Sequence, residues 1–413
     1  MRRSGSQPVA TMLSYEQALS ALEEEFTAAN LSPKTEIVPL SEASGRILAE
    51  HVQADRDYPP FHRSMRDGFA VRSGDVDHTG VTLKLTGEVR AGQYPQSPVE
   101  EGQCVEIMTG APLPAGADAV AMVEHARVEG DWVQIERPLK AFENVVCQGS
   151  EAAKGRHVLP PGRRLGAGEI GLLASVGKAR ISVYRKPIVA ILPTGDEIVP
   201  ADQEPEWYQI RNSNSAMLSA LAIAAGAAPR EMPVGPDEKE ALRQMVQEGL
   251  KADLLLLSGG VSVGKYDFVK EVLAGLGAQF SFQSVALRPG KPVVFGRAQG
   301  TFFFGLPGNP VSSFVTFELF VRPAIQALGG RKFERPQFLR ARLGCSLRHK
   351  GGFTRFVPAQ VETRDSEPQV QPVEWQGSGD LVGAAGANCL LVIHPDESTL
   401  QAGAWVDVLP RLS

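Results

Sequence analysis

Three short loops in this chain of 413 residues carry residue types that could bind an anion or a metal ion. They are the segments 194–197 (TGDE), 258–264 (SGGVSVG) and 305–310 (GLPGNP). Each follows an apolar run, and its glycines let a ligand approach the backbone closely. The third loop contains no His, Cys, Asp, Glu or Lys, so its side chains could not act as an acid, a base or a strong nucleophile.

The third loop has the features of an anion site built from backbone N–H groups. Asn309 is placed to cap the helix predicted after it, and Pro310 takes the first helical position, where a missing N–H costs nothing. Pro307 stiffens the loop, while Gly308 allows close approach. Free N–H groups and the positive end of the helix dipole then favour an anion. The alternative is a tight strand-to-helix turn that binds nothing.

The second loop repeats this device and adds two hydroxyl groups, on Ser258 and Ser262. Two cations lie nearby in the sequence, because segment 287–292 (LRPGKP) places Arg288 and Lys291 around a Pro-Gly turn just before the third apolar strand. Cations beside loops rich in N–H groups favour the anion interpretation. A solvated surface turn is the alternative for these two residues.

Carboxylates near the loops suggest a metal ion. Glu197 could be a metal ligand, a proton-transfer group or a plain loop residue. Asp237 stands three residues before Glu240 and fits a helix N-cap, and Asp267 fits a cap in the same way. Carboxylates that converge near bound phosphate commonly hold Mg²⁺, which prefers oxygen ligands.

The elements that must position these loops are buried strands alternating with helices. Strands are predicted at the apolar runs before the three loops, and helices over 14–28, 214–226, 237–250, 268–276 and 311–327. Strands that are apolar throughout, alternating with helices, predict a parallel sheet covered on both faces. Ligands bind beyond the carboxyl ends of such strands, so we expect the three loops to open onto one crevice.

The flanking parts of the chain predict β structure. Residues 55–146 read as a mostly β module, in which 81–86 and 132–136 alternate strictly between apolar and polar residues. Helical periodicity fades after residue 330, and 331–413 predicts a small β domain. The expected fold class is α/β plus β, with several domains.

Composition excludes several classes of protein. A hydrophobic content of 43% and a charged content of 22% fit a soluble globular protein, and the net charge of -5 argues against a nucleic-acid partner. The four cysteines, Cys104, Cys147, Cys345 and Cys389, include no CxxC pair, so neither a zinc site nor a disulfide framework is indicated. We expect the protein to reside in a reducing cytoplasm. We expect no membrane span, because no run of about 18 apolar residues occurs.

The sequence resembles the molybdopterin molybdenumtransferase family of MoeA and the gephyrin E domain, over nearly the whole chain. The motifs are SGRILAEHV (44–52), RDGFAVR (66–72), EIMTGAPLPAGADAV (106–120), LGAGEIGLLASVG (165–177), ILPTGDE (191–197), IRNSNSAML (210–218), SGGVSVGKYDF (258–268), RPGKP (288–292), GLPGNPVS (305–312) and SGDLVGAAGANCLLVIHP (378–395). GLPGNP and PTGDE are shared with single-domain adenylyltransferases of the same pathway. MTGAPLP and SGGVSVG select the MoeA branch.

The resemblance implies an elongated four-part homodimer whose active cleft is completed by the other subunit. It also implies insertion of molybdate into adenylylated molybdopterin with release of AMP, assisted by a divalent cation such as Mg²⁺. Substrate phosphate and molybdate are both oxyanions, and neither needs a protein nucleophile. Catalysis would then consist mostly of positioning and electrostatics.

Domains and site residues follow from the same resemblance. The expected domains are a linker and dimerisation domain (27–54 and 147–184), the inserted β-rich module (55–146), the α/β molybdopterin-binding domain (12–26 and 185–330) and the C-terminal β domain (331–413). The expected catalytic residues are Thr109, Glu197, Asp237 and Asp267, the last three also as metal ligands. The expected substrate contacts are Gly195, Asp196, Ser258, Gly259, Gly260, Ser262, Gly264, Arg288, Lys291, Pro307, Gly308, Asn309, Pro310 and Ser312.

One segment departs from the family pattern. Relatives usually read PPFDxSAMDGYA, whereas here His62 takes the place of an acid implicated in activity and Arg66 that of a methionine. Asp67 and Gly68 remain. Glu106, where arginine is common, partly reverses the added positive charge.

These departures keep a second function open, that of a non-catalytic scaffold or regulator that binds molybdopterin or molybdate. A third function, that of an adenylyltransferase acting one step earlier, is disfavoured by the loop sequences. Possible partners are the upstream adenylyltransferase and the downstream molybdoenzymes. The sequence does not distinguish molybdate from tungstate, because both oxyanions have nearly the same charge and shape.

Overall fold

The computed structural model describes residues 12–260, 268–364 and 366–411. The chain divides into two compact units. Unit 1 comprises residues 1–36, 45–49 and 182–413, and unit 2 comprises residues 37–44 and 50–181. None of the helices over the described residues has both the length and the apolar character needed to cross a membrane.

The core of unit 1 is a six-stranded sheet in the order β16-β13-β17-β21-β20-β18. The first four strands run parallel, β20 is antiparallel to β21, and β18 is antiparallel to β20. The bounds are Ala228–Glu231 (β16), Ile188–Pro193 (β13), Leu254–Ser258 (β17), Thr301–Leu306 (β21), Val294–Ala298 (β20) and Gln279–Phe282 (β18). The predicted mostly parallel sheet is confirmed, and β13, β17 and β21 are the three predicted strands.

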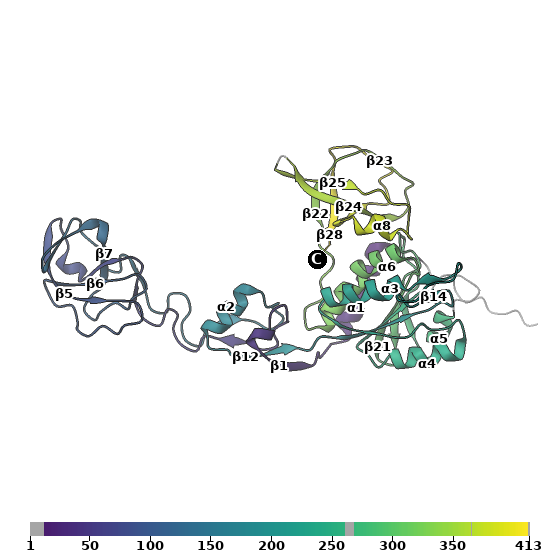
Figure 1. Cartoon of the computed structure of the whole chain (residues 1–413), viewed down its shortest axis with the longest axis horizontal. Helices are drawn as coiled ribbons and strands as arrows, with labels where there is room; N and C mark the ends of the chain where they lie inside the picture. Colours follow the sequence, from purple (N-terminus) through teal and green to yellow (C-terminus); the bar gives the residue numbers. More distant parts are fainter. Residues whose placement is uncertain (1–11, 261–267, 365, 412–413) are drawn as a thin grey trace, which may run out of the picture. The chain divides into compact units, whose positions relative to one another are not determined.

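Helices lie on both sides of this sheet (Figure 1), and alternate residues of the central strands pack against the two different layers. Val189 and Ile191 face the layer formed by α1, α3, α6 and α7, whereas Ala190 and Leu192 face α4 and α5. Because neither face of the sheet meets water, these strands are apolar throughout. The helices span Tyr15–Ala28 (α1), Ser213–Ala224 (α3), Lys239–Gly249 (α4), Val269–Gly275 (α5), Pro310–Thr316 (α6) and Arg322–Leu328 (α7).

The sheet contains a hairpin that the sequence pattern did not predict. Strands β20 and β21 are joined by Gln299 and Gly300, whose φ angles are 50° and 87°. Positive φ at both central residues is the geometry of a type I′ turn, which matches the twist of paired strands. The segment with Arg288 and Lys291 therefore precedes β20, and the expectation that it leads directly into the third apolar strand is wrong.

A π-helical segment, η4 (Phe317–Val321), joins α6 to α7 in one buried helical run. It contains Glu318, whose carboxylate pairs with the Arg322 guanidinium through distances of 2.6 Å (Nε to Oε2) and 2.8 Å (Nη2 to Oε1). Both side chains are almost fully buried, so each charge depends on the other for compensation.

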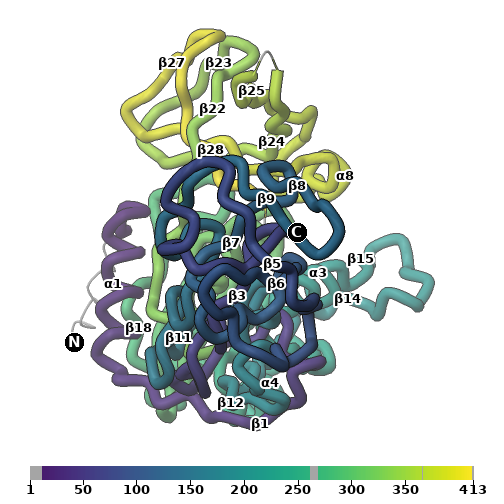
Figure 2. The backbone as a smooth tube through the Cα atoms, turned by 90° about the vertical axis from the view of Figure 1, so that its left-hand side faces the viewer, coloured from purple at the N-terminus to yellow at the C-terminus, as the bar shows by residue number. Residues whose placement is uncertain are grey.

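The C-terminal part of unit 1 is a closed, barrel-like sheet. Pairing runs β24-β25-β22-β28-β26 and returns to β24, which abolishes free edges along this ring. The short β19 (Leu287–Arg288) adds to β24, so the loop with Arg288 is fixed to the barrel. Figure 2 shows these strands in green to yellow. The bounds are Leu339–Leu343 (β22), Leu347–Arg348 (β23), Thr354–Arg364 (β24), Glu367–Pro372 (β25), Leu381–Ala385 (α8), Cys389–Ile393 (β26), Thr399–Leu400 (β27) and Trp405–Pro410 (β28).

Unit 2 is built on a second six-stranded sheet in the order β7-β4-β6-β5-β9-β8. The bounds are Ala119–Met122 (β7), Gly68–Val71 (β4), Gln103–Ile107 (β6), Val81–Val89 (β5), Trp132–Ile135 (β9) and Ala126–Glu129 (β8). The two alternating segments predicted as strands are β5 and β9, and their inward residues, including Leu83, Val133 and Ile135, form the core.

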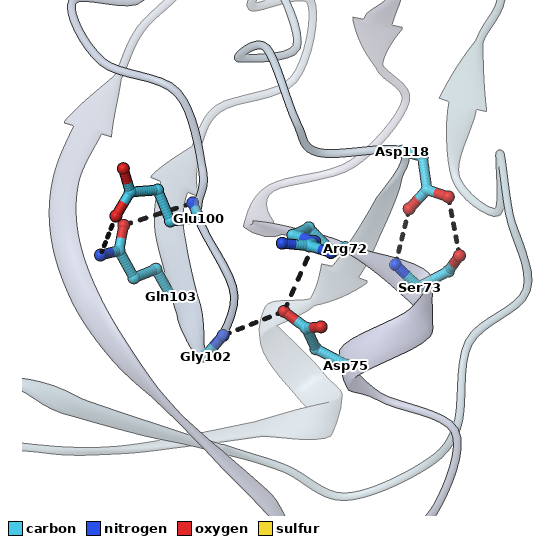
Figure 3. Close-up of polar contacts among 7 residues, drawn as sticks. All are labelled: Arg72, Ser73, Asp75, Glu100, Gly102, Gln103 and Asp118. Carbon is cyan, nitrogen blue, oxygen red and sulfur yellow. Dashed lines mark hydrogen bonds and ion pairs between the residues drawn. The ribbon is translucent and has the colours of Figure 1, made fainter.

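Polar contacts tie the loops of this sheet together (Figure 3). Asp118 accepts hydrogen bonds from the backbone N–H and the hydroxyl of Ser73, at 2.6 and 2.7 Å. Asp75 accepts one from the Gly102 N–H at 3.0 Å and lies 3.8 Å from the Arg72 guanidinium. These carboxylates therefore have structural roles within the module.

The remaining elements are short. They are η1 (Leu40–Glu42), η2 (Ser73–Asp75), η3 (Val123–His125), α2 (Ala167–Ser175), β1 (Thr35–Pro39), β2 (Val52–Gln53), β3 (Arg63–Ser64), β10 (Val145–Val146), β11 (His157–Leu159), β12 (Arg180–Tyr184), β14 (Ile198–Val199) and β15 (Ile210–Arg211). The predicted domain boundaries remain a prediction.

Candidate functional site

The carboxyl ends of β13, β17 and β21 lie at one level of the sheet. Pro193 pairs with Ser258, and Ser258 pairs with Leu306, so the loops that follow start side by side. A cavity of about 640 Å³ opens there, which we call the large cavity. The three loops contribute Thr194, Gly195, Glu197, Ser258, Gly259, Gly260, Pro307, Gly308, Asn309 and Pro310 to its lining. The prediction that the loops open onto one crevice is confirmed.

The carboxylate of Glu197 lies directly over Gly195. Gly195 has a φ angle of 139°, and a Cβ at this position would lie 2.5 Å from Glu197 Oε2. Only glycine leaves room for the carboxylate in this position. The TGDE sequence therefore places an acid at the wall of the large cavity.

Asp196 and Asp237 connect the first loop to the start of α4. The backbone N–H of Asp237 donates to Asp196 Oδ1 at 3.1 Å, and Asp237 lines the large cavity. Asp196 is not part of the described lining, and its contact with a ligand stays a prediction. The cap of α4 is Glu238, whose carboxylate accepts from the N–H groups of Glu240 and Ala241 at 3.1 and 2.8 Å. The prediction that Asp237 caps this helix is therefore wrong, because the helix begins at Lys239.

Asn214 is a site residue that the sequence reasoning missed. Its side-chain NH₂ donates to Ser258 Oγ at 2.9 Å and to the Gly308 carbonyl at 2.8 Å, so one amide joins the second and third loops. The nearby Asn212 caps α3 by accepting from the Ser215 N–H at 3.0 Å. A second asparagine just after the cap of an apolar helix was the available signal, because the cap itself explains only one.

Asn309 stands at the N-cap position of α6, as predicted, but its side chain does not cap the helix. Its NH₂ donates to Ser378 Oγ at 3.0 Å, and the Val311 N–H donates to the Ser378 carbonyl at 3.0 Å. The third loop is thus attached to the C-terminal barrel as well as to the sheet.

A second cavity of about 450 Å³, which we call the basic cavity, lies where the sheet meets the barrel. Arg288, Lys291 and Arg355 line it, together with Ser312 and Ser378. Arg288 stacks on the ring of Phe353, with the guanidinium carbon 4.6 Å from the ring centre. The Nε of Arg355 is buried and has no hydrogen-bond partner in the described part of the chain. Such a donor is suited to an anion.

The two cavities adjoin, because Pro292, Pro307 and Asn309 line both. The large cavity presents backbone and hydroxyl groups, and the basic cavity presents cationic groups. The predicted contacts Ser262 and Gly264 and the predicted metal ligand Asp267 lie outside the described residues. The role of every predicted contact in ligand binding stays a prediction.

Metal binding would rest on carboxylates. Among the described residues no group of three or more His, Cys, Asp or Glu side chains is placed to hold a metal ion. Glu197 and Asp237 both line the large cavity, while the third predicted metal ligand, Asp267, lies outside the described residues.

Two thiols are unsuited to nucleophilic chemistry. Burial raises the pKa of Cys104 to about 12 and that of Cys389 to about 11, so both remain protonated at neutral pH.

The predicted residue Thr109 belongs to unit 2. Its backbone N–H and its hydroxyl both donate to Asp67 Oδ1, at 2.6 and 2.8 Å. These two donors hold the pKa of Asp67 below its usual value, because they stabilise the carboxylate.

His62 is also fixed in place: its Nδ1 accepts from the Gln148 N–H at 3.2 Å and its ring lies 5.6 Å from that of Phe142.

Together, this fold and these cavities define an α/β protein whose loops and cations at the carboxyl ends of the strands are suited to an oxyanion-bearing ligand. Comparison with known proteins is consistent with that class. Three family models match: the MoeA N-terminal region (domain I and II) over residues 13–177, a probable molybdopterin binding domain over 190–327, and the MoeA C-terminal region (domain IV) over 340–411.

Similar proteins cover nearly the full length. A molybdopterin molybdenumtransferase from Staphylococcus epidermidis is 36% identical over 377 residues, which is 90% of this chain and 90% of the relative. One from Nostoc sp. is 37% identical over 396 residues, or 92% and 91%. A solved structure of a molybdopterin biosynthesis MoeA protein from Pyrococcus horikoshii is 31% identical, with a TM-score of 0.79 over 97% of this chain and 99% of that one. The chain belongs to the MoeA family.

Proposed function

We propose that the protein is a molybdopterin molybdenumtransferase that inserts molybdate into adenylylated molybdopterin and releases AMP with the help of Mg²⁺. The observation that carries the proposal is the junction of the two cavities. A ligand held in the large cavity and an oxyanion held in the basic cavity would meet at Pro292, Pro307 and Asn309. Two reactants held in contact react far faster than two free molecules.

The large cavity suits the organic substrate. Its volume lies in the range typical of small-molecule sites, roughly 300 to 1,000 Å³. Its loops carry glycines and backbone groups that can approach phosphate closely. We propose Gly195, Ser258, Gly259, Gly260, Gly308 and Pro310 as its contacts, with Asp196, Ser262 and Gly264.

The basic cavity suits molybdate. Arg288, Lys291 and Arg355 supply positive charge for a dianion, and Ser312 lies beside them. Fixed cations also stabilise negative charge that develops on transferring oxygens. Since molybdate and phosphate need only positioning and charge compensation, the reaction requires no protein nucleophile.

Glu197 and Asp237 fit the preference of Mg²⁺ for oxygen ligands, and with Asp267 they are the residues we propose to hold it. The cation would offset the negative charge of the substrate phosphates.

The proposal further includes the four domains expected from the sequence, a cytoplasmic homodimer and a contribution of Thr109 to catalysis. The four free cysteines fit a reducing compartment.

The test combines purified protein with adenylylated molybdopterin, molybdate and Mg²⁺, and AMP release is measured by chromatography. The proposal expects AMP release that depends on molybdate and produces active cofactor. Arg355→Ala should raise KM for molybdate about tenfold or more, because a charged donor is lost. The control is Arg348→Ala, because Arg348 is an exposed arginine of the same C-terminal part of unit 1 and lies outside the described cavity linings. ATP consumption on molybdopterin would instead identify an adenylyltransferase.

A non-catalytic scaffold is the second candidate, and His62 is the observation that favours it. An imidazole accepts the Gln148 N–H where the family usually has an acid. Binding of the substrates without AMP release would support the scaffold. His62→Asp then tests the departure directly: a large gain in the rate of AMP release would mean that the native residue limits activity.

The oligomeric state is tested by sedimentation equilibrium. The proposed homodimer predicts twice the 44.3 kDa of one chain. A monomer at micromolar concentration would contradict this part of the proposal and leave the activity assay to decide the rest.

A further inference from the structure

Two buried polar atoms at the large cavity have no hydrogen-bond partner within the described part of the chain. They are Thr194 Oγ1 and Asn214 Oδ1, on residues that are 4% and 8% exposed. Both residues line the large cavity. A buried polar atom without a hydrogen bond lowers the stability of the fold, and native proteins retain few such atoms without a reason.

The direction of the Asn214 amide is fixed by its other contacts. Its nitrogen donates to the Gly308 carbonyl, which can only accept, so the NH₂ group must face that oxygen. Exchanging the two ends of the amide would bring two acceptors together. The oxygen Oδ1 is therefore the end that remains for a ligand, and it can only accept a hydrogen bond.

Thr194 contacts the same residue as Asn214, namely Ser258. Its backbone N–H donates to the Ser258 carbonyl at 2.9 Å, while Asn214 donates to the Ser258 hydroxyl. The Thr194 hydroxyl lies against the glycine pair: Cβ atoms at Gly259 and Gly260 would be 3.1 and 3.0 Å from Oγ1. Both residues that carry an unpartnered atom are therefore hydrogen-bonded to Ser258.

We infer that Thr194 and Asn214 form a subsite for a neutral hydrogen-bond donor of the substrate, an O–H or N–H group, and that they orient the substrate in the large cavity. The negative end of an amide dipole repels an anion, so phosphate belongs elsewhere along the loops. This inference rests on the proposed function, whose substrate offers two sources of such donors. They are the ribose hydroxyls of the adenylate half and the ring N–H groups of the pterin half.

Asn214 has two roles that variants can separate. Asn214→Ala removes the carbonyl acceptor and also the link between Ser258 and Gly308. Thr194→Val removes only a hydroxyl, keeps the side-chain volume and leaves that link intact. The control is Ser219→Ala on the same helix, since Ser219 is equally buried but donates to Glu231 at 2.6 Å and lies outside the described lining.

Binding is measured by isothermal titration calorimetry with AMP, 2′-deoxy-AMP, 3′-deoxy-AMP and, without oxygen, molybdopterin. We expect Asn214→Ala and Thr194→Val to weaken the binding of one half of the substrate about tenfold or more. Ser219→Ala should leave the binding of every probe unchanged. If the donor is a ribose hydroxyl, the wild-type preference for AMP over one deoxy analogue shrinks in both variants. If it is a pterin N–H, molybdopterin binding falls and AMP binding does not. A merely structural role would not produce this dependence on one ligand group.

Equal binding of every probe by wild type and both variants, with unchanged melting temperatures, would overturn the inference and leave the proposed function intact. Failure of wild type to bind any probe and to release AMP would contradict the proposed function, and the subsite with it. Unfolding of Asn214→Ala alone leaves the decision to Thr194→Val.

Discussion

The carboxylate of Asp67 is held by two donors of a single residue, Thr109. Because its folded-state pKa lies below the unfolded value of about 3.9, this contact stabilises the fold above that pH. The contribution is lost as the pH falls through the depressed folded-state pKa.

Thr109→Val removes the hydroxyl and keeps the backbone N–H. We therefore expect the pKa of Asp67 to rise toward its ordinary value without fully reaching it, as measured by NMR titration of the carboxyl group. Thr109→Ser keeps the donor and should leave the pKa unchanged. An unaltered pKa in Thr109→Val would show that the hydroxyl contributes nothing.

Gly195 controls the position of Glu197. Gly195→Ala would place a methyl group 2.5 Å from Glu197 Oε2, so the carboxylate must move. If the proposed function holds, the rate of AMP release should fall about 10- to 100-fold, since small displacements at a reacting site have effects of this size.

The control for this substitution is Gly226→Ala. Gly226 also has a positive φ angle, 96°, but a Cβ there meets no atom within 4 Å. Both variants share the backbone strain of roughly 1 to 3 kcal/mol. Equal loss of AMP release in both would contradict a specific role for Glu197.

At the scale of elements, the π-helical segment contains the buried pair Glu318 and Arg322. Glu318→Gln leaves the arginine charge buried without a counter-ion, and we expect a loss of about 3 to 5 kcal/mol in the free energy of unfolding, measured with urea. The double variant Glu318→Met/Arg322→Leu removes both charges and should be clearly less damaging. A double variant at least as unstable as the single one would contradict this account.

The sequence pattern predicted the strands that are buried on both faces, because a run such as LLLLS at 254–258 is unambiguous in its burial. It did not predict the hairpin of β20 and β21. Its turn, Gln299-Gly300, lacks the asparagine or aspartate that usually marks a type I′ turn. Only the pairing of the two strands reveals it.

The sequence pattern also predicted only part of the candidate site. Glycine-rich loops after apolar strands were sufficient to predict where the crevice lies, since parallel strands end at one edge of a sheet. Asn214 and Arg355 were missed because their importance comes from partners far along the chain: Gly308 for one, and the loop of Arg288 and Lys291 for the other. Spacing in the sequence carries no such information.

At the scale of the whole molecule, the chain has separate cores in its two units. Leu83 is buried in the core of unit 2 with Val133 and Ile135, and Phe303 is buried in unit 1 between the sheet and the layer of α4 and α5. A protein with several cores need not unfold in one step. We therefore expect two transitions in differential scanning calorimetry.

Core substitutions identify which transition belongs to which unit. Leu83→Ala and Phe303→Ala each remove buried apolar contacts and should destabilise their own unit by about 2 to 5 kcal/mol. Leu83→Ala is expected to lower the midpoint of one transition only, and Phe303→Ala that of the other. Because the large cavity belongs to unit 1, AMP should protect the transition that Phe303→Ala lowers and leave the other unchanged. If both variants shift a single common transition, the two units unfold as one cooperative structure and the division has no thermodynamic meaning.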